Sequence, residues 1–327
     1  MNPKDYDRTI IMFSGGKDSL ACILWAIENN CPKIELWHHL VDGLPVQGQT
    51  ASTLMDWPIT SGYCKAVARL LSLPIYFSWL EGGFEREMNR SNQAKAKTWF
   101  ETPDGLHSAG GNGGKQSTRQ KFPQISADLS VRWCSAYLKV DVGAIAIRNQ
   151  SRFNDSKTLV ITGERAEESP ARANYAEFEP DRTDNRDGKS NRHVDRFRPI
   201  HGWKESEVWA IIQRHGIIPH PAYHLGWGRL SCMSCIFGSP NQWATIRKIA
   251  PAHFERIANY EQRFCTTIQR KRSVHELANL GTPYAEANNS QLVKMALSSE
   301  WGDYPIWTHP QAWALPAGAY GESNGPT

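Results

Sequence analysis

Apolar residues in the first half of the chain form short blocks that alternate with amphipathic stretches. Four blocks, residues 9–13, 34–40, 75–79 and 158–162, have the length and composition of buried strands. Leu20, Ile23, Leu24 and Ile27 then recur at helical spacing, and residues 64–71 repeat this pattern before Pro74. This alternation predicts an α/β fold, a doubly wound and mostly parallel sheet with helices on both faces.

Two polar stretches interrupt the alternation. Residues from about 92 to 124 include a glycine-rich run, and residues 181–198 are dense in arginine and aspartate without an apolar period. Both are expected to be surface insertions. The second is either a solvated loop or a loop that contacts a polyanionic substrate.

The end of the chain has a different pattern. Phe254, Ile257, Ala258 and Phe264 follow Pro251 at helical spacing. We therefore expect a main domain over residues 1–240 and a helical C-terminal extension with a tryptophan-rich tail over residues 241–327. The tryptophans of the tail, Trp301, Trp307 and Trp313, are expected to pin it to the core.

The loop after the first predicted strand has the chemistry of a phosphate site. It reads Ser14-Gly15-Gly16-Lys17-Asp18-Ser19. Paired glycines let backbone N–H groups approach an anion, and the N-terminus of the following helix adds a favourable dipole. Lys17 supplies a positive charge and the two serines supply hydroxyl donors, whereas Asp18 suits a phosphate site only if it binds Mg²⁺ or caps the helix. The alternative without a ligand is a turn that only caps the helix. The sequence of the loop does not match the Walker A pattern.

Charge and cysteine content narrow the class of protein. The net charge of +4 permits a nucleic-acid partner without requiring one, and no apolar run approaches the roughly 20 residues that span a bilayer. The polar start lacks the features of a signal peptide, so we expect a cytoplasmic protein with no membrane association. Seven scattered cysteines do not suggest a disulfide framework. Cys232 and Cys235 form a C-x-x-C pair, which can hold a metal, exchange disulfides, or do neither.

The loop resembles the PP-loop of adenine-nucleotide α-hydrolases, which split ATP between its α and β phosphates. The likeness is strongest to the phosphoadenosine-phosphosulfate-reductase-like branch and runs from Thr9 to Phe237. It rests on Val41-Asp42-Gly43, on the stretch from Gly163 through Glu164, Arg165, Glu168 and Ser169 to Arg172, on Arg198-Pro199-Ile200 with Trp203 and Trp209, on His220-Pro221-Ala222-Tyr223, and on the C-x-x-C pair. Glu207, His220 and Ser231 depart from the pattern of the branch.

The resemblance implies a Rossmann-like fold and a nucleotide site. It implies that ATP and Mg²⁺ are bound by the loop (Ser14, Gly15, Gly16, Lys17, Asp18, Ser19) with Asp42, Gly163, Arg165 and Arg172, and that Lys17, Asp18 and Arg165 are catalytic. The residues independently support Arg165, because a cation just past a strand end on the ligand edge can neutralise phosphate charge. Arg172 alone would more often be a surface charge or the partner of Glu168.

The resemblance also assigns a role to Cys134. This residue matches the cysteine that joins the C-x-x-C pair in iron–sulfur members of the branch, so Cys134, Cys232 and Cys235 are implied ligands of a cluster. Zinc is the alternative, although a closed zinc site needs a fourth ligand, and Cys265 could supply it. Free or redox-active thiols are the third possibility.

Several members of the branch compete as the function. A sulfonucleotide reductase would need a nucleophilic cysteine near its C-terminus, and none follows Cys265. Sulfate adenylyltransferase lacks this cysteine set, and tRNA 2-thiocytidine enzymes have the cysteines in the reverse order. The chain most resembles the ATP pyrophosphatases of DNA phosphorothioation systems in bacterial defence. That likeness implies adenylation of a DNA phosphate and sulfur insertion, with a cysteine desulfurase, DNA and other DNA-modification subunits as partners. A non-catalytic, reductase-like regulator of transcription is the alternative from another class.

Overall fold

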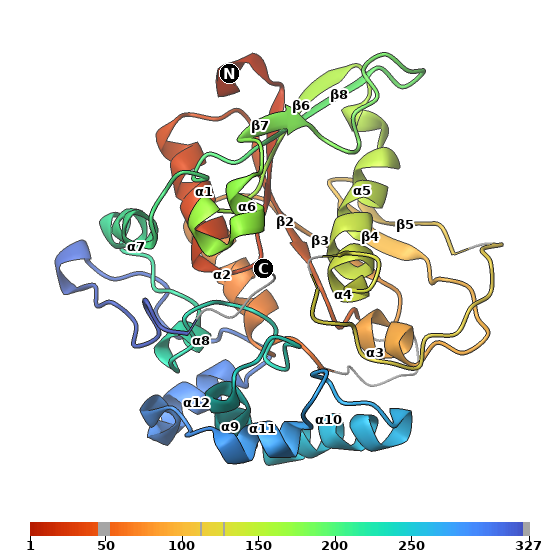
Figure 1. Ribbon diagram of the computed structural model, residues 1–327. Coiled ribbons are helices and arrows are strands. Elements are labelled where there is room, and N and C mark those ends of the chain that lie inside the picture. The colour runs from red at the N-terminus through yellow and green to blue at the C-terminus, as the bar shows by residue number, and fades with distance from the viewer. Residues whose placement is uncertain (45–52, 112, 127, 323–327) are drawn as a thin grey trace.

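The fold is built on one eight-stranded sheet. The computed structural model describes residues 1–44, 53–111, 113–126 and 128–322. The strand order is β5-β4-β3-β2-β1-β6-β8-β7 (Figure 1). The strands are β1 (Arg8–Met12), β2 (Ile34–His39), β3 (Ile75–Leu80), β4 (Thr98–Thr102), β5 (Gly105–Ala109), β6 (Ser156–Ile161), β7 (Phe178–Pro180) and β8 (Arg192–Phe197). The five inner strands β3, β2, β1, β6 and β8 run parallel, and the outer strands β4, β5 and β7 run antiparallel to their neighbours.

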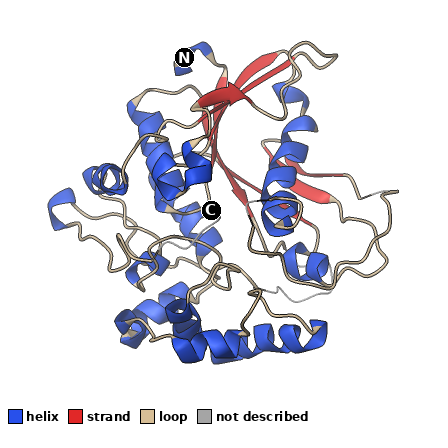
Figure 2. Cartoon of the chain, viewed as in Figure 1, coloured by secondary structure: helices blue, strands red, loops and turns tan. Residues whose placement is uncertain are grey.

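Helices cover both faces of the sheet, as Figure 2 shows. They are α1 (Lys17–Glu28), α2 (Thr60–Leu70), α3 (Gly83–Met88), α4 (Trp133–Ser135), α5 (Asp141–Arg148), α6 (Pro170–Ala173), α7 (Glu205–Arg214), α8 (Pro221–His224), α9 (Pro240–Ile249), α10 (Pro251–Phe264), α11 (Val274–Leu280) and α12 (Ser290–Ala296). Successive residues of a strand pack into two hydrophobic cores, one on each face of the sheet, because their side chains alternate between the faces. Ile11 packs with α1 and α2, whereas Ile10 packs with Ile147 of α5. The predicted doubly wound α/β fold is confirmed.

The two segments expected to be polar insertions are partly strands, and that prediction is wrong. Within residues 92–124, β4 and β5 form an antiparallel hairpin on the edge of the sheet, with Phe100 buried. Within residues 181–198, β8 pairs in parallel with β6. Its charges are compatible with a strand because they are paired: Arg196 donates to Asp181 at 2.6 Å.

The C-terminal part is helical, as predicted. Helices α9 to α12 lie together below the sheet in Figure 1, and their apolar side chains join the same core as α1 and α2. The tail that follows is pinned by its tryptophans. The ring of Trp301 lies 5.3 Å from that of Tyr63, and the indole N–H groups of Trp307 and Trp313 donate to backbone carbonyls at 3.0 and 2.8 Å. Among the described residues, no helix combines the length and the apolar character that crossing a bilayer requires.

Candidate functional site

The predicted phosphate loop lies where a doubly wound sheet binds ligands. β1 has β2 on one side and β6 on the other, so the chain changes direction across the sheet at β1. Ligands of such sheets bind beyond the carboxyl ends of the strands at this switch point. The loop of residues 14–19 follows β1 directly and leads into α1, whose first residue is Lys17. Gly15 takes a φ of +83°, a conformation that favours glycine.

Hydrogen bonds within the loop hold it in shape. The Ser19 hydroxyl donates to the carbonyl of Gly16 at 2.9 Å and accepts the backbone N–H of Ser14 at 3.2 Å. The hydroxyls of Ser14 and Ser19 also lie 3.2 Å apart. Ser14 is exposed and lines a cavity, so its hydroxyl is available to a ligand. These hydrogen bonds fix the shape of the loop around its backbone N–H groups.

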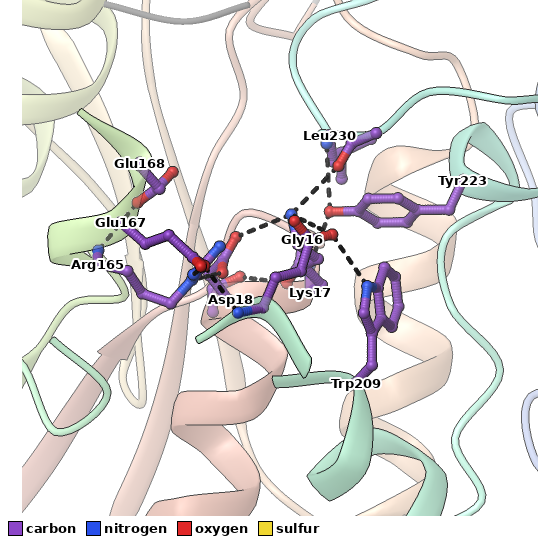
Figure 3. A network of polar contacts seen from close by, with 12 residues as sticks. Gly16, Lys17, Asp18, Arg165, Glu167, Glu168, Trp209, Tyr223 and Leu230 are labelled. Atoms are coloured by element: carbon purple, nitrogen blue, oxygen red, sulfur yellow. Dashed lines mark hydrogen bonds and ion pairs between the residues drawn. The ribbon is translucent and has the colours of Figure 1, made fainter. Parts of the chain in front are cut away.

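Lys17 is held from several directions at the start of α1, as Figure 3 shows. Its backbone N–H donates to the Tyr223 hydroxyl at 2.9 Å, and its ammonium donates to the carbonyl of Gly228 at 3.2 Å. The ammonium also lies 3.6 Å from a carboxylate oxygen of Asp18 and 3.7 Å from one of Glu205. Burial lowers the pKa of Lys17, but the charges of Asp18 and Glu205 outweigh burial and raise it overall. Lys17 is thus a charged, fixed side chain.

An ion pair joins the ends of β1 and β6. The Arg165 guanidinium donates to Asp18 at 2.6 Å, to Glu167 at 2.5 Å and to the carbonyl of Trp203 at 3.2 Å. Gly163 makes this approach possible, because a Cβ at this position would lie 2.9 Å from the carbonyl carbon of Asp18. Burial raises the pKa of Asp18, yet the charges of Lys17 and Arg165 lower it overall. Asp18 is therefore an ionised carboxylate between two cations.

Two neighbouring cavities divide the predicted site residues. The larger, of about 530 Å³, is lined by Ser14, Gly16, Asp18, Ser19 and Gly163, among others. The smaller, of about 330 Å³, is lined by Lys17 and Arg165. Glu168, Arg172 and Arg229 line both cavities and form a shared wall. The structure therefore brings the loop, Gly163, Arg165 and Arg172 together. Lys17 and Arg165 line the smaller cavity, and Asp18, which contacts both, lines the larger one.

Arg172 and Asp42 both make contacts within the protein, and for Arg172 the contact is the pairing with Glu168 that the sequence offered as an alternative. Arg172 forms an ion pair with Glu168 on the shared wall. Asp42 accepts the backbone N–H groups of Met55 and Asp56 at 3.1 and 2.9 Å, and it is not among the described residues that line the larger cavity. Burial raises the pKa of Asp42 to about 7. In this structure Asp42 fixes the chain that precedes α2, and its predicted contact with adenosine stays a prediction.

The three predicted metal-ligating cysteines all interact electrostatically with Lys139. Burial raises the pKa of Cys134 to about 11, and the nearby Cys235 adds to the shift. Burial lowers the pKa of Lys139, but Cys232, Asp56 and Cys134 raise it more. Even so, the described part of the chain contains no group of three His, Cys, Asp or Glu side chains close enough to hold a metal ion. As placed, the thiols do not form a ligand set for a cluster, so its presence stays a prediction.

Sequence reasoning missed several residues of the site. Lys139 lines the larger cavity and lies within a π-helical stretch at residues 136–140. A 3.6-residue hydrophobic period does not reveal this type of helix. Tyr223 belongs to the His220-Pro221-Ala222-Tyr223 stretch that carries the family resemblance, but the sequence assigned it no role. Glu205, next to Lys17, carried no signal beyond its place in the first turn of α7.

Comparisons with known proteins agree with this geometry. The phosphoadenosine phosphosulfate reductase domain matches residues 112–237, which include Arg165, Arg172 and the three cysteines but not the loop of residues 14–19. An uncharacterized 37.8 kDa protein of Escherichia phage 186 is 28% identical over 287 residues, which are 81% of this chain and 77% of that protein. The adenosine 5'-phosphosulfate reductase of Allochromatium vinosum is 31% identical over 75 residues, which are 23% of this chain and 26% of that enzyme. Residues 112–237 are thus similar to the phosphoadenosine phosphosulfate reductase domain, and most of the chain is similar to the phage protein.

Proposed function

We propose that this protein is an ATP pyrophosphatase that adenylates an acceptor and releases pyrophosphate. The observation that carries the proposal is the loop of residues 14–19 at the switch point of the sheet, tied by the 2.6 Å pair between Asp18 and Arg165 to the end of β6. The similarity to the phosphoadenosine phosphosulfate reductase domain supports an enzyme that acts on an adenine nucleotide of this general kind.

The proposed reaction transfers an adenylyl group. An acceptor oxygen attacks the α-phosphorus of ATP, the bond from that phosphorus to the oxygen bridging to the β-phosphate breaks, and pyrophosphate leaves with the electron pair. Lys17 and Arg165, which line the smaller cavity, suit the stabilisation of the charge on the departing pyrophosphate. The hydroxyls of Ser14 and Ser19 can donate to phosphate oxygens in the larger cavity.

Mg²⁺ is expected to accompany the nucleotide. This ion usually takes one or two protein carboxylates together with substrate phosphates, so a full protein cage is not required. Asp18 is ionised and lines the larger cavity beside the loop, which makes it the residue that would share Mg²⁺ with the phosphates. When bound, the ion would neutralise the charge that builds on the leaving group.

The finer proposal is that the acceptor is a DNA backbone phosphate and that sulfur then displaces AMP. Arg132, Arg196 and Arg198 line the larger cavity, and the half-exposed ring of Tyr175 at the same cavity lies 5.1 Å from the Arg198 guanidinium. Cationic and aromatic side chains in one groove suit a single strand of nucleic acid. One of the cysteines near Lys139 would take a sulfane sulfur from the persulfide of a partner cysteine desulfurase, whose own cysteine leaves as a thiolate. The terminal sulfur would displace AMP, a second cysteine would cleave the S–S bond to leave the phosphorothioate, and an external dithiol would reduce the disulfide so formed. Other DNA-modification subunits would present the strand.

The test is release of pyrophosphate from ATP and Mg²⁺ by anaerobically purified protein, with and without an oligonucleotide acceptor and a cysteine desulfurase. We expect release that Lys17→Met reduces by at least about 100-fold, while Lys4→Met, an exposed control, leaves it unchanged. Iron and sulfide assays on the same sample test the cluster. Folded protein that binds ATP but never releases pyrophosphate would favour the regulatory alternative.

A second candidate is reduction of a sulfonucleotide. It is favoured by the similarity over 75 residues to the adenosine 5'-phosphosulfate reductase of Allochromatium vinosum. Incubation of the protein with adenosine 5'-phosphosulfate and a dithiol distinguishes the two. Release of sulfite would support the reductase, whereas pyrophosphate release from ATP without sulfite formation would support the ATP pyrophosphatase.

A further inference from the structure

The C-terminal segment of residues 316–322 runs beside the phosphate site. The backbone N–H of Gly318 donates to the carbonyl of Tyr223 at 2.8 Å, and the N–H of Tyr320 donates to the Glu205 carboxylate at 3.3 Å. At the end of the segment, the Glu322 carboxylate accepts from Asn241 at 2.7 Å and from Tyr284 at 3.2 Å. The segment is thus anchored at both ends and in its middle.

One route connects this segment to Lys17 through Gly228. The carbonyl of Gly228 accepts the Lys17 ammonium at 3.2 Å. A Cβ on Gly228 would lie 2.5 Å from the carbonyl oxygen of Gly321, so the two backbones pack with no room for a side chain. The position of the segment therefore determines where the Gly228 carbonyl can lie.

A second route runs through Glu205. One carboxylate oxygen of Glu205 accepts the indole N–H of Trp209 at 3.0 Å and the backbone N–H of Tyr320 at 3.3 Å. The same oxygen lies 3.7 Å from the Lys17 ammonium, which is only 4% exposed. Tyr320 and Gly321 also line the smaller cavity with Lys17 and Arg165.

We propose that the segment of residues 316–322 is part of the phosphate site and positions the Lys17 ammonium through Gly228 and Glu205. The proposal deepens the proposed function and rests on it for the identity of the anion, a pyrophosphate group. The segment lies outside residues 112–237, the part matched by the phosphoadenosine phosphosulfate reductase domain.

Exclusion of water is the physical reason for such a wall. The interaction of an ammonium with a phosphate strengthens as water is removed from the site, and displacement of a catalytic group by about 1 Å can cost about 100-fold in rate. Without the segment, one wall of the smaller cavity is lost, and the Gly228 carbonyl loses the backbone that it packs against.

The test is a double-mutant cycle between Gly228→Ala and a chain that ends at Leu315. Gly228 does not have a positive φ, and the three atoms nearest to its added Cβ all belong to Gly321 and Glu322, so alanine conflicts with the segment itself. Gly202→Ala is the matched control, because an added Cβ there meets nothing within 4 Å. A chain that ends at Glu322 is the control for truncation. The readouts are the dissociation constant for inorganic pyrophosphate by calorimetry and kcat and KM for pyrophosphate release from ATP.

We expect Gly228→Ala and the truncation each to weaken pyrophosphate binding about tenfold and to lower kcat/KM by about 10- to 100-fold, with melting temperatures close to that of the wild type. The double variant should bind pyrophosphate and turn over ATP as well as the truncated chain alone. Effects that simply multiply, or a folded truncated chain with unchanged pyrophosphate affinity, would overturn the proposal. If the wild type binds pyrophosphate and the cycle is non-additive but ATP is not turned over, the proposed function fails and the positioning role stands.

Discussion

Replacing Tyr223 by phenylalanine removes a single oxygen from the centre of the site. That oxygen accepts the backbone N–H of Lys17 at 2.9 Å and the backbone N–H of Leu230 at 3.2 Å. Tyr223 itself is 1% exposed, so the ring should stay in place while the hydroxyl is lost. The variant therefore tests whether one phenol connects the phosphate loop to the chain after α8.

The cost follows from the two donors left without an acceptor. A buried N–H without a partner costs about 1–3 kcal/mol, and solvent in the larger cavity can reach Leu230, so the sum is about 2–4 kcal/mol. For a chain of 327 residues the entropy of unfolding is about 0.7 kcal/mol/K. The melting temperature should then fall by about 3–6 °C.

Calorimetry on the wild type and on Tyr223→Phe measures this shift, with Tyr63→Phe as a control. Tyr63 is also buried, but its hydroxyl makes one hydrogen bond, to the carbonyl of Ile218 at 3.1 Å, and it lies outside the loop. We expect about half the destabilisation in the control and a loss of pyrophosphate release only in Tyr223→Phe. A change below about 0.5 kcal/mol with full activity would refute the role assigned to the hydroxyl.

Three further predictions concern charge. Arg165→Lys loses the planar guanidinium fork and should lower kcat/KM for pyrophosphate release by about 100-fold or more. The same change at the exposed Arg214 should leave kcat/KM unaltered. Equal activities of the two variants would count against the role of Arg165. Burial lowers the pKa of His220 to about 3, so its stabilising contribution is complete above pH 6.5 and is lost as the pH falls toward 3. Between pH 6.5 and 3, the free energy of unfolding of the wild type should fall by about 1.4 kcal/mol per pH unit relative to that of His220→Asn, as measured by urea unfolding. The same pH dependence of stability in the two proteins would contradict this. Burial raises the pKa of Cys134 to about 11, so in metal-free protein iodoacetamide should modify it about tenfold more slowly at pH 7.5 than an unshifted thiol. Mass spectrometry can follow it beside the exposed Cys265, and equal rates at the two sites would contradict the shift.

Most of the central fold could be predicted from the sequence because its strands are buried on both faces. Continuous apolar blocks such as residues 9–13 and 158–162 have a clear signature, and they correspond to β1 and β6 within two residues. β8 has no such signature. Its Arg196 and Asp195 are charged, and their pairing with Asp181 and Arg186 earlier in the same segment makes these charges compatible with a strand. The sequence shows the charges but not which of them pair.

The site could be predicted only where one short string contains the chemistry. The loop of residues 14–19 carries glycines, a cation and hydroxyls together, and it follows β1 at the carboxyl edge of the sheet as expected. The compartment of Lys17, in contrast, is completed by Glu205, Gly228 and Tyr320, which are far apart in the sequence. Two of these act through backbone groups that any residue carries. No residue type could have identified them.

The division into two cavities bears on the proposed reaction. An in-line displacement at phosphorus requires the attacking and the leaving oxygen to lie on opposite sides of the reacting centre. Cys232 and the arginines suited to an acceptor line the larger cavity, whereas Lys17 and Arg165 line the smaller one. If the α-phosphate lies near the wall shared by Glu168, Arg172 and Arg229, the acceptor approaches from one compartment and pyrophosphate departs into the other. Lys17 and Arg165 would then stabilise the negative charge that develops on the departing pyrophosphate.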